Sequence, residues 1–175
     1  WLETHRPFHW PAEFYEIIQG RGGFDVIIGN PPYININKIN YKVNFDGFFA
    51  PDIYGYIVNR VFGILNSVSR HGFIIMHNIA FSDDFADVRD IIKKNSNSLW
   101  VSFFARIPAG LFSGEVRVRN CIYLVDKNKD KSGHKYTTKI HRWFAKSRPH
   151  LLEKINYVLF SDRKVFPMFN DKLLA

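Results

Sequence analysis

The sequence contains one cysteine, Cys121, and no long run of apolar residues. A single cysteine cannot form a disulfide within the chain, which fits a reducing compartment, and we interpret Cys121 as a packing residue of an apolar strand. No apolar run reaches the length that a bilayer requires, so no membrane-spanning segment is predicted. The first residue is Trp1 rather than Met, and the sequence does not open with a charged-then-apolar leader. We therefore expect a piece of a longer polypeptide without a targeting segment, and the single cysteine fits a location in the cytoplasm.

Acidic side chains are scarce relative to basic ones. The 175 residues include 24 Lys and Arg against 16 Asp and Glu, which gives a formal net charge of +8. This balance suits a protein that binds a polyanion such as nucleic acid, and it equally fits a basic surface with no partner. Hydrophobic residues make up 46% of the sequence and aromatic residues 17%, which is enough for the core of one globular domain.

Two patterns that resemble ligand sites do not have the context that such sites need. The glycine-rich stretch 20–23 leaves a predicted helix and enters a strand, whereas a phosphate-binding loop follows a strand and opens a helix. His5 and His9 have the spacing of a metal-binding pair on a helix, but Pro7 and Pro11 interrupt that helix. The sequence therefore predicts no metal site.

The strongest local signal is a strand that runs into a rigid corner. Val26, Ile27 and Ile28 are consecutive β-branched residues, a pattern typical of a central parallel strand covered on both faces. Pro31 and Pro32 follow, and the strand ends there because proline cannot donate to a sheet ladder and fixes its own φ. The sequence therefore predicts a buried strand that stops at a fixed bend.

The residues at this bend suit a specific chemistry. Pro32 holds Pro31 in an extended conformation, which keeps the Pro31 carbonyl pointing beyond the strand. The Asn30 side chain adds a second acceptor, so the two together can hold both hydrogens of a planar amino group while Tyr33 lies against its ring. Holding the hydrogens draws the nitrogen toward a geometry in which its lone pair can attack. The alternative is an ordinary strand-ending Asn-Pro turn.

Asn30-Pro31-Pro32-Tyr33 after an apolar strand resembles the catalytic motif of amino-group methyltransferases that use S-adenosylmethionine. The longer run from Pro7-Phe8-His9-Trp10 to Tyr33-Ile34 is similar to the DNA adenine methyltransferases of type IIG restriction-modification and related phage-defence systems. The resemblance implies methylation of the 6-amino group of an adenine that has been rotated out of double-stranded DNA. The four motif residues would be catalytic, and Asn30 would also meet the S-adenosylmethionine cofactor.

The resemblance implies further contacts to the substrate. Phe112, in the glycine-rich loop before an expected strand, is the candidate for a ring that covers the far face of the base; it would otherwise be a hydrophobic plug. Lys38 lies in a polar loop after the motif and is a candidate phosphate contact. Arg117 and Arg119 alternate with valines and therefore share one face of the expected strand. They would touch phosphate or form a solvated edge.

The fold that the resemblance implies is of the α/β class. It is part of a Rossmann-like methyltransferase sheet with mostly parallel strands, helices on both faces and an antiparallel strand pair at one edge. Residues 1–150 would form the C-terminal half of the catalytic domain, and residues 151–175 a linker helix toward a target-recognition domain elsewhere in the parent polypeptide. The glycine-rich turn and the acidic residue of a donor-binding half are not found. These 175 residues alone are therefore expected not to turn over.

Hydrophobic periodicity and turn residues predict the remaining elements. We expect a short helix over 12–19, a helix from 51 to 65, a turn over 69–72, strands over 73–76, 99–107, 116–126 and 136–143, and helices over 82–95 and 149–160. The strand at 24–28, the helix after it and the strand at 73–76 would form a right-handed crossover that makes the two strands parallel.

Three other functions stay open at this level. A protein-glutamine methyltransferase uses the same corner on a side-chain amide, although the basic charge and the long loop after the motif favour nucleic acid. An RNA adenine methyltransferase fits the same residues. A non-catalytic nucleic-acid-binding module would retain the fold without the reaction, and binding of DNA without binding of the methyl donor would identify it.

Overall fold

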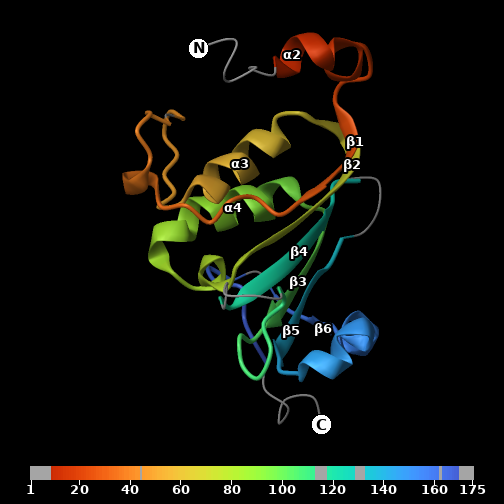
Figure 1. The fold of residues 1–175 in the computed structure, drawn as a ribbon. Helices are drawn as coiled ribbons and strands as arrows, with labels where there is room; N and C mark the ends of the chain where they lie inside the picture. The colour runs from red at the N-terminus through yellow and green to blue at the C-terminus, as the bar shows by residue number, and fades with distance from the viewer. Residues whose placement is uncertain (1–8, 44, 113–117, 129–132, 162, 170–175) are drawn as a thin grey trace.

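A computed structural model describes residues 9–43, 45–112, 118–128, 133–161 and 163–169. Six strands form one sheet in the order β1-β2-β4-β3-β5-β6 (Figure 1). Their bounds are β1 Phe24–Gly29, β2 Leu65–Met76, β3 Ser98–Phe104, β4 Asn120–Asp126, β5 Lys135–His141 and β6 Val158–Leu159. Before the sheet, a short helix α2 (Trp10–Glu13) and a π-helical turn (Glu16–Gly20) lead into β1.

The sheet is mixed, with mostly parallel strands. β1 pairs in parallel with β2, and β3 pairs in parallel with β5. β4 is antiparallel to both β2 and β3, so β1, β2, β3 and β5 all run in one direction. The predicted α/β class and the predicted parallel crossover from β1 to β2 are therefore confirmed. The antiparallel pair of β3 and β4 is also present, and β5 and β6 extend the sheet beyond it.

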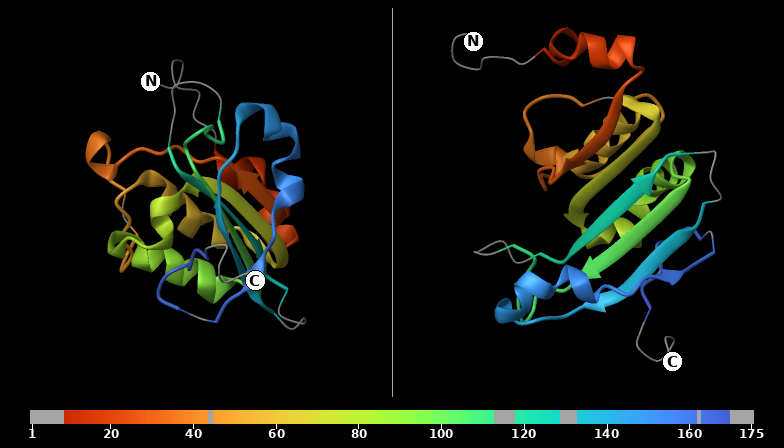
Figure 2. Two further views of the ribbon diagram at one scale, coloured as in Figure 1. Left: turned by 90° about the horizontal axis from the view of Figure 1, so that it is seen from below. Right: turned by 90° about the vertical axis from the view of Figure 1, so that its right-hand side faces the viewer.

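Two helices cover one face of the sheet (Figures 1 and 2). Helix α3 (Ile53–Phe62) connects β1 to β2, and helix α4 (Ala86–Asn95), entered through a 3-10 turn (Asp83–Phe85), connects β2 to β3. Their apolar sides meet inward-facing strand residues in the main core, where the Tyr54 and Phe85 rings stack with centroids 5.1 Å apart. No helix in the described part of the chain is long and apolar enough to cross a membrane.

The other face is covered mainly at one end. A second cluster of Phe104, Trp143 and Leu151 forms there, beneath two 3-10 helices, η5 (Ala145–His150) and η6 (Leu152–Lys154). The helix predicted over 149–160 is therefore wrong: after η6 the chain becomes extended and adds β6 to the sheet. Tertiary packing decides this, because Phe160 belongs to the main core and is held there while its backbone donates to the Lys135 carbonyl.

The structure also corrects the position of β1. It lies at an edge of the sheet, with Val26 57% exposed and Ile28 77% exposed. No described strand pairs with its outer edge, and its outward apolar face is bare, so the prediction of a strand covered on both faces is wrong for this chain. Ile27 points the other way and packs on the main core. A β-branched run with both faces apolar at an exposed edge is unusual, because such edges favour pairing with other chains.

β2 begins earlier than its sequence predicts. The turn expected over 69–72 is instead the middle of a 12-residue strand that starts at Leu65. Ser69 and His71 are buried within it, and β2 is stabilised by partners on both sides, β1 and β4. The approach to β1 is close: Gly23 has φ of +128°, and a Cβ there would lie 2.5 Å from the Ile64 carbonyl oxygen.

Candidate active site at the carboxyl edge of the sheet

The carboxyl ends of the parallel strands meet at one edge of the sheet, which we call the carboxyl edge. In open α/β sheets this edge is where ligands bind. The motif Asn30–Tyr33 follows β1 there, and the turn His77–Ala80 follows β2. β4 runs in the opposite direction, so its first residue, Asn120, lies at the same edge, directly across from Met76. Figure 2 shows the strand ends side by side.

Tyr33 is held by three hydrogen-bonding groups. Its hydroxyl lies 2.8 Å from the Asn30 Oδ1 and 3.0 Å from the Ile74 carbonyl oxygen, and it accepts a hydrogen bond from the Asn120 Nδ2 at 3.1 Å. A hydroxyl has one hydrogen, so it donates fully to only one of the two oxygens at a time. The Tyr33 ring also meets the edge of Tyr54, with centroids 6.2 Å apart. These contacts fix the position and the plane of the ring.

The Tyr33 hydroxyl stays a neutral phenol. Burial raises the pKa of Tyr33 to about 12, the nearby Cys121 thiol adds to the rise, and the hydrogen bond from Asn120 opposes it. The phenol therefore keeps its hydrogen at neutral pH and donates it to Asn30 or to the Ile74 carbonyl. Tyr33 can act here as a ring and a hydrogen-bond donor, and it cannot act as a base.

Asn30 faces an opening. The residue is exposed, whereas the adjacent Pro31 is buried, and both line a groove of about 800 Å³ beside β1 and α3. The groove is mostly apolar, with Phe24, Ile28 and Phe73 among its lining residues. An exposed amide next to a buried, rigid proline has the arrangement that an amino-group binding corner needs.

The groove fits only part of the cofactor that the sequence resemblance implies. Its apolar lining suits a thioether and an aromatic ring, and Asn30 contributes an uncharged amide. Its described lining residues contain no carboxylate to hold ribose hydroxyls, and Arg60 is the charged residue among them. The described part of the chain also holds no group of three potential metal ligands among its His, Cys, Asp and Glu residues.

The other predicted substrate contacts lie at different places. Lys38 is exposed in a short 3-10 helix (Ile36–Lys38) of the loop after the motif. Phe112 is half-buried in the loop after β3. Arg119 is exposed, and its carbonyl accepts a hydrogen bond from the His77 backbone N–H at 3.0 Å, which keeps it at the carboxyl edge. Arg117 lies outside the described residues. Of the described residues in the strand predicted over 116–126, Val118 and Arg119 lie outside β4, which begins at Asn120.

Sequence reasoning missed Asn120 as a member of the site. It is 1% exposed, its Nδ2 reaches the Tyr33 hydroxyl, and the Ile75 carbonyl lies 3.5 Å from the same nitrogen. We describe it as a positioning residue, because it contacts Tyr33 rather than the groove. The available signal was a lone asparagine at the start of the apolar run Cys121–Val125. A buried amide in such a place needs a partner.

The comparisons with known proteins agree with this fold. The family described as Eco57I restriction-modification methylase matches residues 2–107. A putative type II restriction enzyme and methyltransferase of Methanocaldococcus jannaschii is 32% identical over 133 residues, which cover 75% of this chain. The chain spans only 11% of that relative's length.

Solved structures share the fold at low sequence identity. The DrdV–DNA complex has a TM-score of 0.64 at 16% identity, covering 83% of this chain and 18% of that one. A nuclease-deletion mutant of the type ISP restriction-modification enzyme LlaGI, in complex with a DNA substrate mimic, has a TM-score of 0.61 at 14% identity, covering 93% and 20%. A putative class I S-adenosylmethionine-dependent methyltransferase of Listeria monocytogenes has a TM-score of 0.53 at 15% identity, covering 75% and 40%. On the family match and the curated relative together, this chain belongs to the Eco57I restriction-modification methylase family.

Proposed function

We propose that this chain is the substrate-binding half of a methyltransferase that transfers a methyl group from S-adenosylmethionine to the 6-amino group of adenine in double-stranded DNA. The enzyme would serve restriction-modification or phage defence in the cytoplasm. One observation carries the proposal: an exposed Asn30 amide stands beside a Tyr33 ring that three hydrogen-bonding groups hold at the carboxyl edge. The family membership and the DNA-bound neighbours support it.

The motif residues act on an adenine that has rotated out of the duplex. Rotating the base out costs a few kcal/mol. Tyr33 stacks on the adenine ring, while Asn30 Oδ1 and the Pro31 carbonyl accept the two hydrogens of the 6-amino group. Asn30 Oδ1 has two lone pairs, so it can accept from the amine while it keeps the Tyr33 hydroxyl; alternatively that hydroxyl turns to the Ile74 carbonyl. Pro32 keeps the bend rigid.

The donor supplies an electrophilic methyl group when it is bound. Asn30 and the Pro31 carbonyl would hold the 6-amino nitrogen with its lone pair toward that methyl group, and the nitrogen would release one of its two hydrogens to water as a proton. Asn30 and the Pro31 carbonyl are uncharged. Their partly negative oxygens stabilise the positive charge that develops on the nitrogen. Positioning of the amine supplies much of the remaining acceleration.

A donor-binding half would have to come from residues outside this chain. We propose that it packs on the outer edge of β1 and on the bare face that Val26 and Ile28 present. Three features support this: the exposure of both side chains, the apolar groove along the same strand, and the lack of a carboxylate among its described lining residues. By the same proposal, the 175 residues alone bind the base and do not turn over. A link from residues 151–175 to a target-recognition domain stays a prediction.

The test is a methylation assay with the parent polypeptide. Transfer of labelled methyl groups to duplex DNA, followed by digestion to nucleosides, should give N6-methyladenine. Asn30→Ala should abolish transfer and leave DNA binding intact, because it removes one of the two acceptors for the amine. Asn156→Ala, at another exposed asparagine, should leave transfer unchanged. Label found instead in protein or RNA, or full activity of the Asn30→Ala enzyme, would contradict the proposal.

A further inference from the structure

A second cavity opens at the carboxyl edge, at the far end from the motif. It has a volume of about 230 Å³ and lies between the end of β5 and the helices η5 and η6. Its described lining residues are His141, Arg142, Trp143, Phe144, Ser147, His150, Leu151 and Lys154. Four strand spacings separate β1 from β5, which amounts to roughly 19 Å at the usual ~4.8 Å per strand. The right-hand view of Figure 2 shows η5 at this edge.

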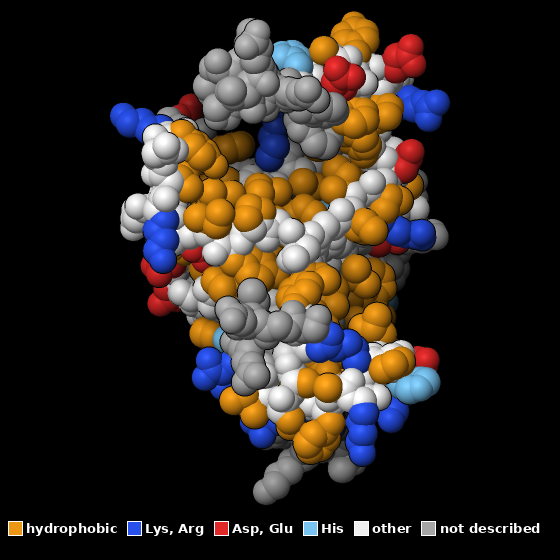
Figure 3. Space-filling model, in the orientation of Figure 1, with side chains coloured by type: hydrophobic (Ala, Val, Ile, Leu, Met, Phe, Trp, Pro, Cys, Tyr) orange, Lys and Arg blue, Asp and Glu red, His pale blue; other side chains and the backbone are white. Residues whose placement is uncertain are grey.

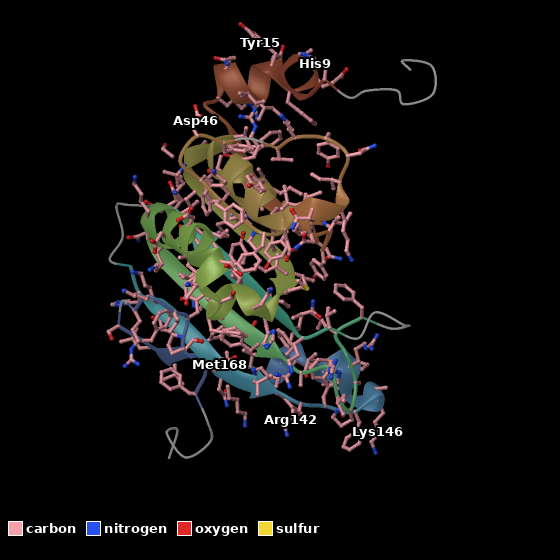
Figure 4. All side chains as sticks on the ribbon, turned by 90° about the vertical axis from the view of Figure 1, so that its left-hand side faces the viewer. His9, Tyr15, Asp46, Arg142, Lys146 and Met168 are labelled. Atoms are coloured by element: carbon pink, nitrogen blue, oxygen red, sulfur yellow. The ribbon has the colours of Figure 1, made fainter. Side chains whose placement is uncertain are left out.

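The surroundings of this cavity are cationic. Residues 142–154 contain four Lys and Arg and one carboxylate, Glu153. That carboxylate lies against the His150 ring, with Oε2 3.1 Å from Nδ1. Arg142 and Lys154 are exposed and line the cavity, and its described lining contains no Asp or Glu. Figure 4 shows Arg142 and Lys146 at the same end of the molecule, and Figure 3 shows Lys and Arg side chains gathered toward that lower end.

The same cluster contains buried donors without an acceptor. Within the described part of the chain, neither the Trp143 Nε1 nor the Arg148 Nε has a hydrogen-bond partner, although both atoms are buried. Trp143 is 6% exposed and lines the cavity. Arg148 is anchored from its other side, where Nη2 donates to the Gly110 carbonyl at 3.1 Å. Trp143 lines the cavity and Arg148 does not, so the Trp143 N–H is the unpaired donor that favours a ligand with acceptor oxygens there.

We infer that this cavity binds a phosphate group of the DNA backbone. A phosphate offers several strong acceptor oxygens and a negative charge. These match the Trp143 N–H, the Ser147 hydroxyl and the guanidinium and ammonium groups of Arg142 and Lys154. The choice of DNA as the source of the phosphate rests on the proposed function. With the duplex axis along the carboxyl edge, roughly 19 Å corresponds to about five or six base pairs between this phosphate and the reacting base.

Salt-dependent DNA binding tests the charges. Arg142→Gln with Lys154→Gln removes two cations at the cavity, and Arg21→Gln with Lys94→Gln removes two exposed cations elsewhere on the chain. Fluorescence anisotropy with a duplex at several salt concentrations should show a slope of log K against log salt reduced by about 1.8 for the cavity pair. The control pair should keep its slope. Equal slopes for both pairs and the unmodified chain would refute the site, while failure of the unmodified chain to bind DNA at all would refute the DNA substrate as well.

A second readout follows the Trp143 indole itself. Its N–H signal in a nitrogen-15 spectrum, identified by its disappearance in Trp143→Phe, should move when duplex DNA is added and should move less in the Arg142→Gln, Lys154→Gln pair. Inorganic phosphate serves as the second probe. A signal that moves with inorganic phosphate and ignores DNA would refute the DNA assignment, and one that ignores both would refute the phosphate site. Asn30→Ala should leave the DNA-induced movement intact, so loss of catalysis and loss of this site are separate results.

Discussion

Asn120 donates a hydrogen bond from its Nδ2 to the Tyr33 hydroxyl oxygen over 3.1 Å, which joins the start of β4 to the corner that follows β1. This bond arrives at a lone pair of the hydroxyl and leaves its hydrogen for Asn30 Oδ1 or the Ile74 carbonyl. The buried amide therefore directs the Tyr33 hydrogen toward these two oxygens. When the hydrogen goes to Asn30 Oδ1, Asn120 also helps to orient the exposed Asn30 amide through Tyr33.

Loss of this bond should slow methyl transfer without preventing binding. We expect Asn120→Ala in the parent enzyme to lower kcat about tenfold with little change in KM, because a hydrogen bond of ordinary strength orients Tyr33 and Asn30. In a Tyr33→Phe background the same substitution should cost almost nothing more, since the two groups act as one unit.

Ser102 provides the control for a merely structural effect. It is also a buried polar residue, and its Oγ donates to the Ile122 carbonyl rather than to Tyr33. Ser102→Ala should leave kcat within about twofold of the unmodified enzyme. Additive losses from Tyr33→Phe and Asn120→Ala in the double variant would show that Asn120 does not act through Tyr33.

Arg89 should be one of the largest contributors to stability. It is 2% exposed, and its guanidinium donates to the carbonyls of Ile79 at 2.8 Å, Ser82 and Lys164 at 2.8 Å. Arg89→Met keeps most of the apolar stem but leaves these carbonyls without their donor, so the free energy of unfolding should fall by about 3–5 kcal/mol. Lys94→Met, at an exposed position on the same helix, should change it by less than about 0.5 kcal/mol. Urea denaturation followed by circular dichroism measures both.

His71 should make the fold sensitive to acid. Burial lowers the pKa of His71 to about 3, and its ring is surrounded by Phe62, Phe73 and Tyr123. In the unfolded chain its pKa is about 6.5, so between pH 6.5 and 3 the unfolded state binds a proton that the folded state does not. The contribution of neutral His71 to the free energy of unfolding is therefore fully present above about pH 6.5. It is lost as the pH falls below that value, at a slope approaching 1.4 kcal/mol per pH unit.

His71→Gln should remove this slope, because glutamine does not titrate and can still hydrogen-bond to the Tyr123 hydroxyl, which lies 3.2 Å from the His71 Nε2. The free energy of unfolding is measured for the variant and for the unmodified protein at several pH values from 7 to 4, and the difference between the two proteins is followed with pH. His9→Gln, at an exposed position, is the control for replacing a histidine by glutamine outside the core. A His71→Gln curve parallel to the original would contradict a neutral, buried histidine.

The bare face of β1 should tolerate charge in this chain and not in the complete enzyme. Ile28 is 77% exposed, so Ile28→Lys should change the free energy of unfolding of the isolated chain by less than about 0.5 kcal/mol and should reduce self-association in light scattering. Ile75→Lys, at a residue that is 0% exposed, should unfold the chain or destabilise it by several kcal/mol. In the parent enzyme, Ile28→Lys should reduce methyl transfer, because the donor-binding half is proposed to cover this residue; unchanged transfer would refute that contact.

Some of this protein follows from the sequence alone. The β-branched run before two prolines was enough to predict a strand that ends at a rigid corner, because proline removes the backbone donor that a sheet needs. The spacing of apolar residues predicted both long helices, since hydrophobic periodicity is a local property, and the order strand, helix, strand predicted the parallel crossover. The resemblance of Asn30–Tyr33 to a methyltransferase motif led to the family that the comparisons show.

Only the tertiary structure decided the rest. Local pattern cannot tell a central strand from an edge strand, because Val26 and Ile28 have the same preferences whether or not another segment covers them. It also could not reveal that 69–72 continues a strand, since β2 is stabilised by partners distant in the chain. Asn120 meets Tyr33 only because folding brings the start of β4 and the end of β1 to one edge of the sheet. Hydrogen bonds and cavities between residues far apart in sequence depend on that arrangement, and no local periodicity records it.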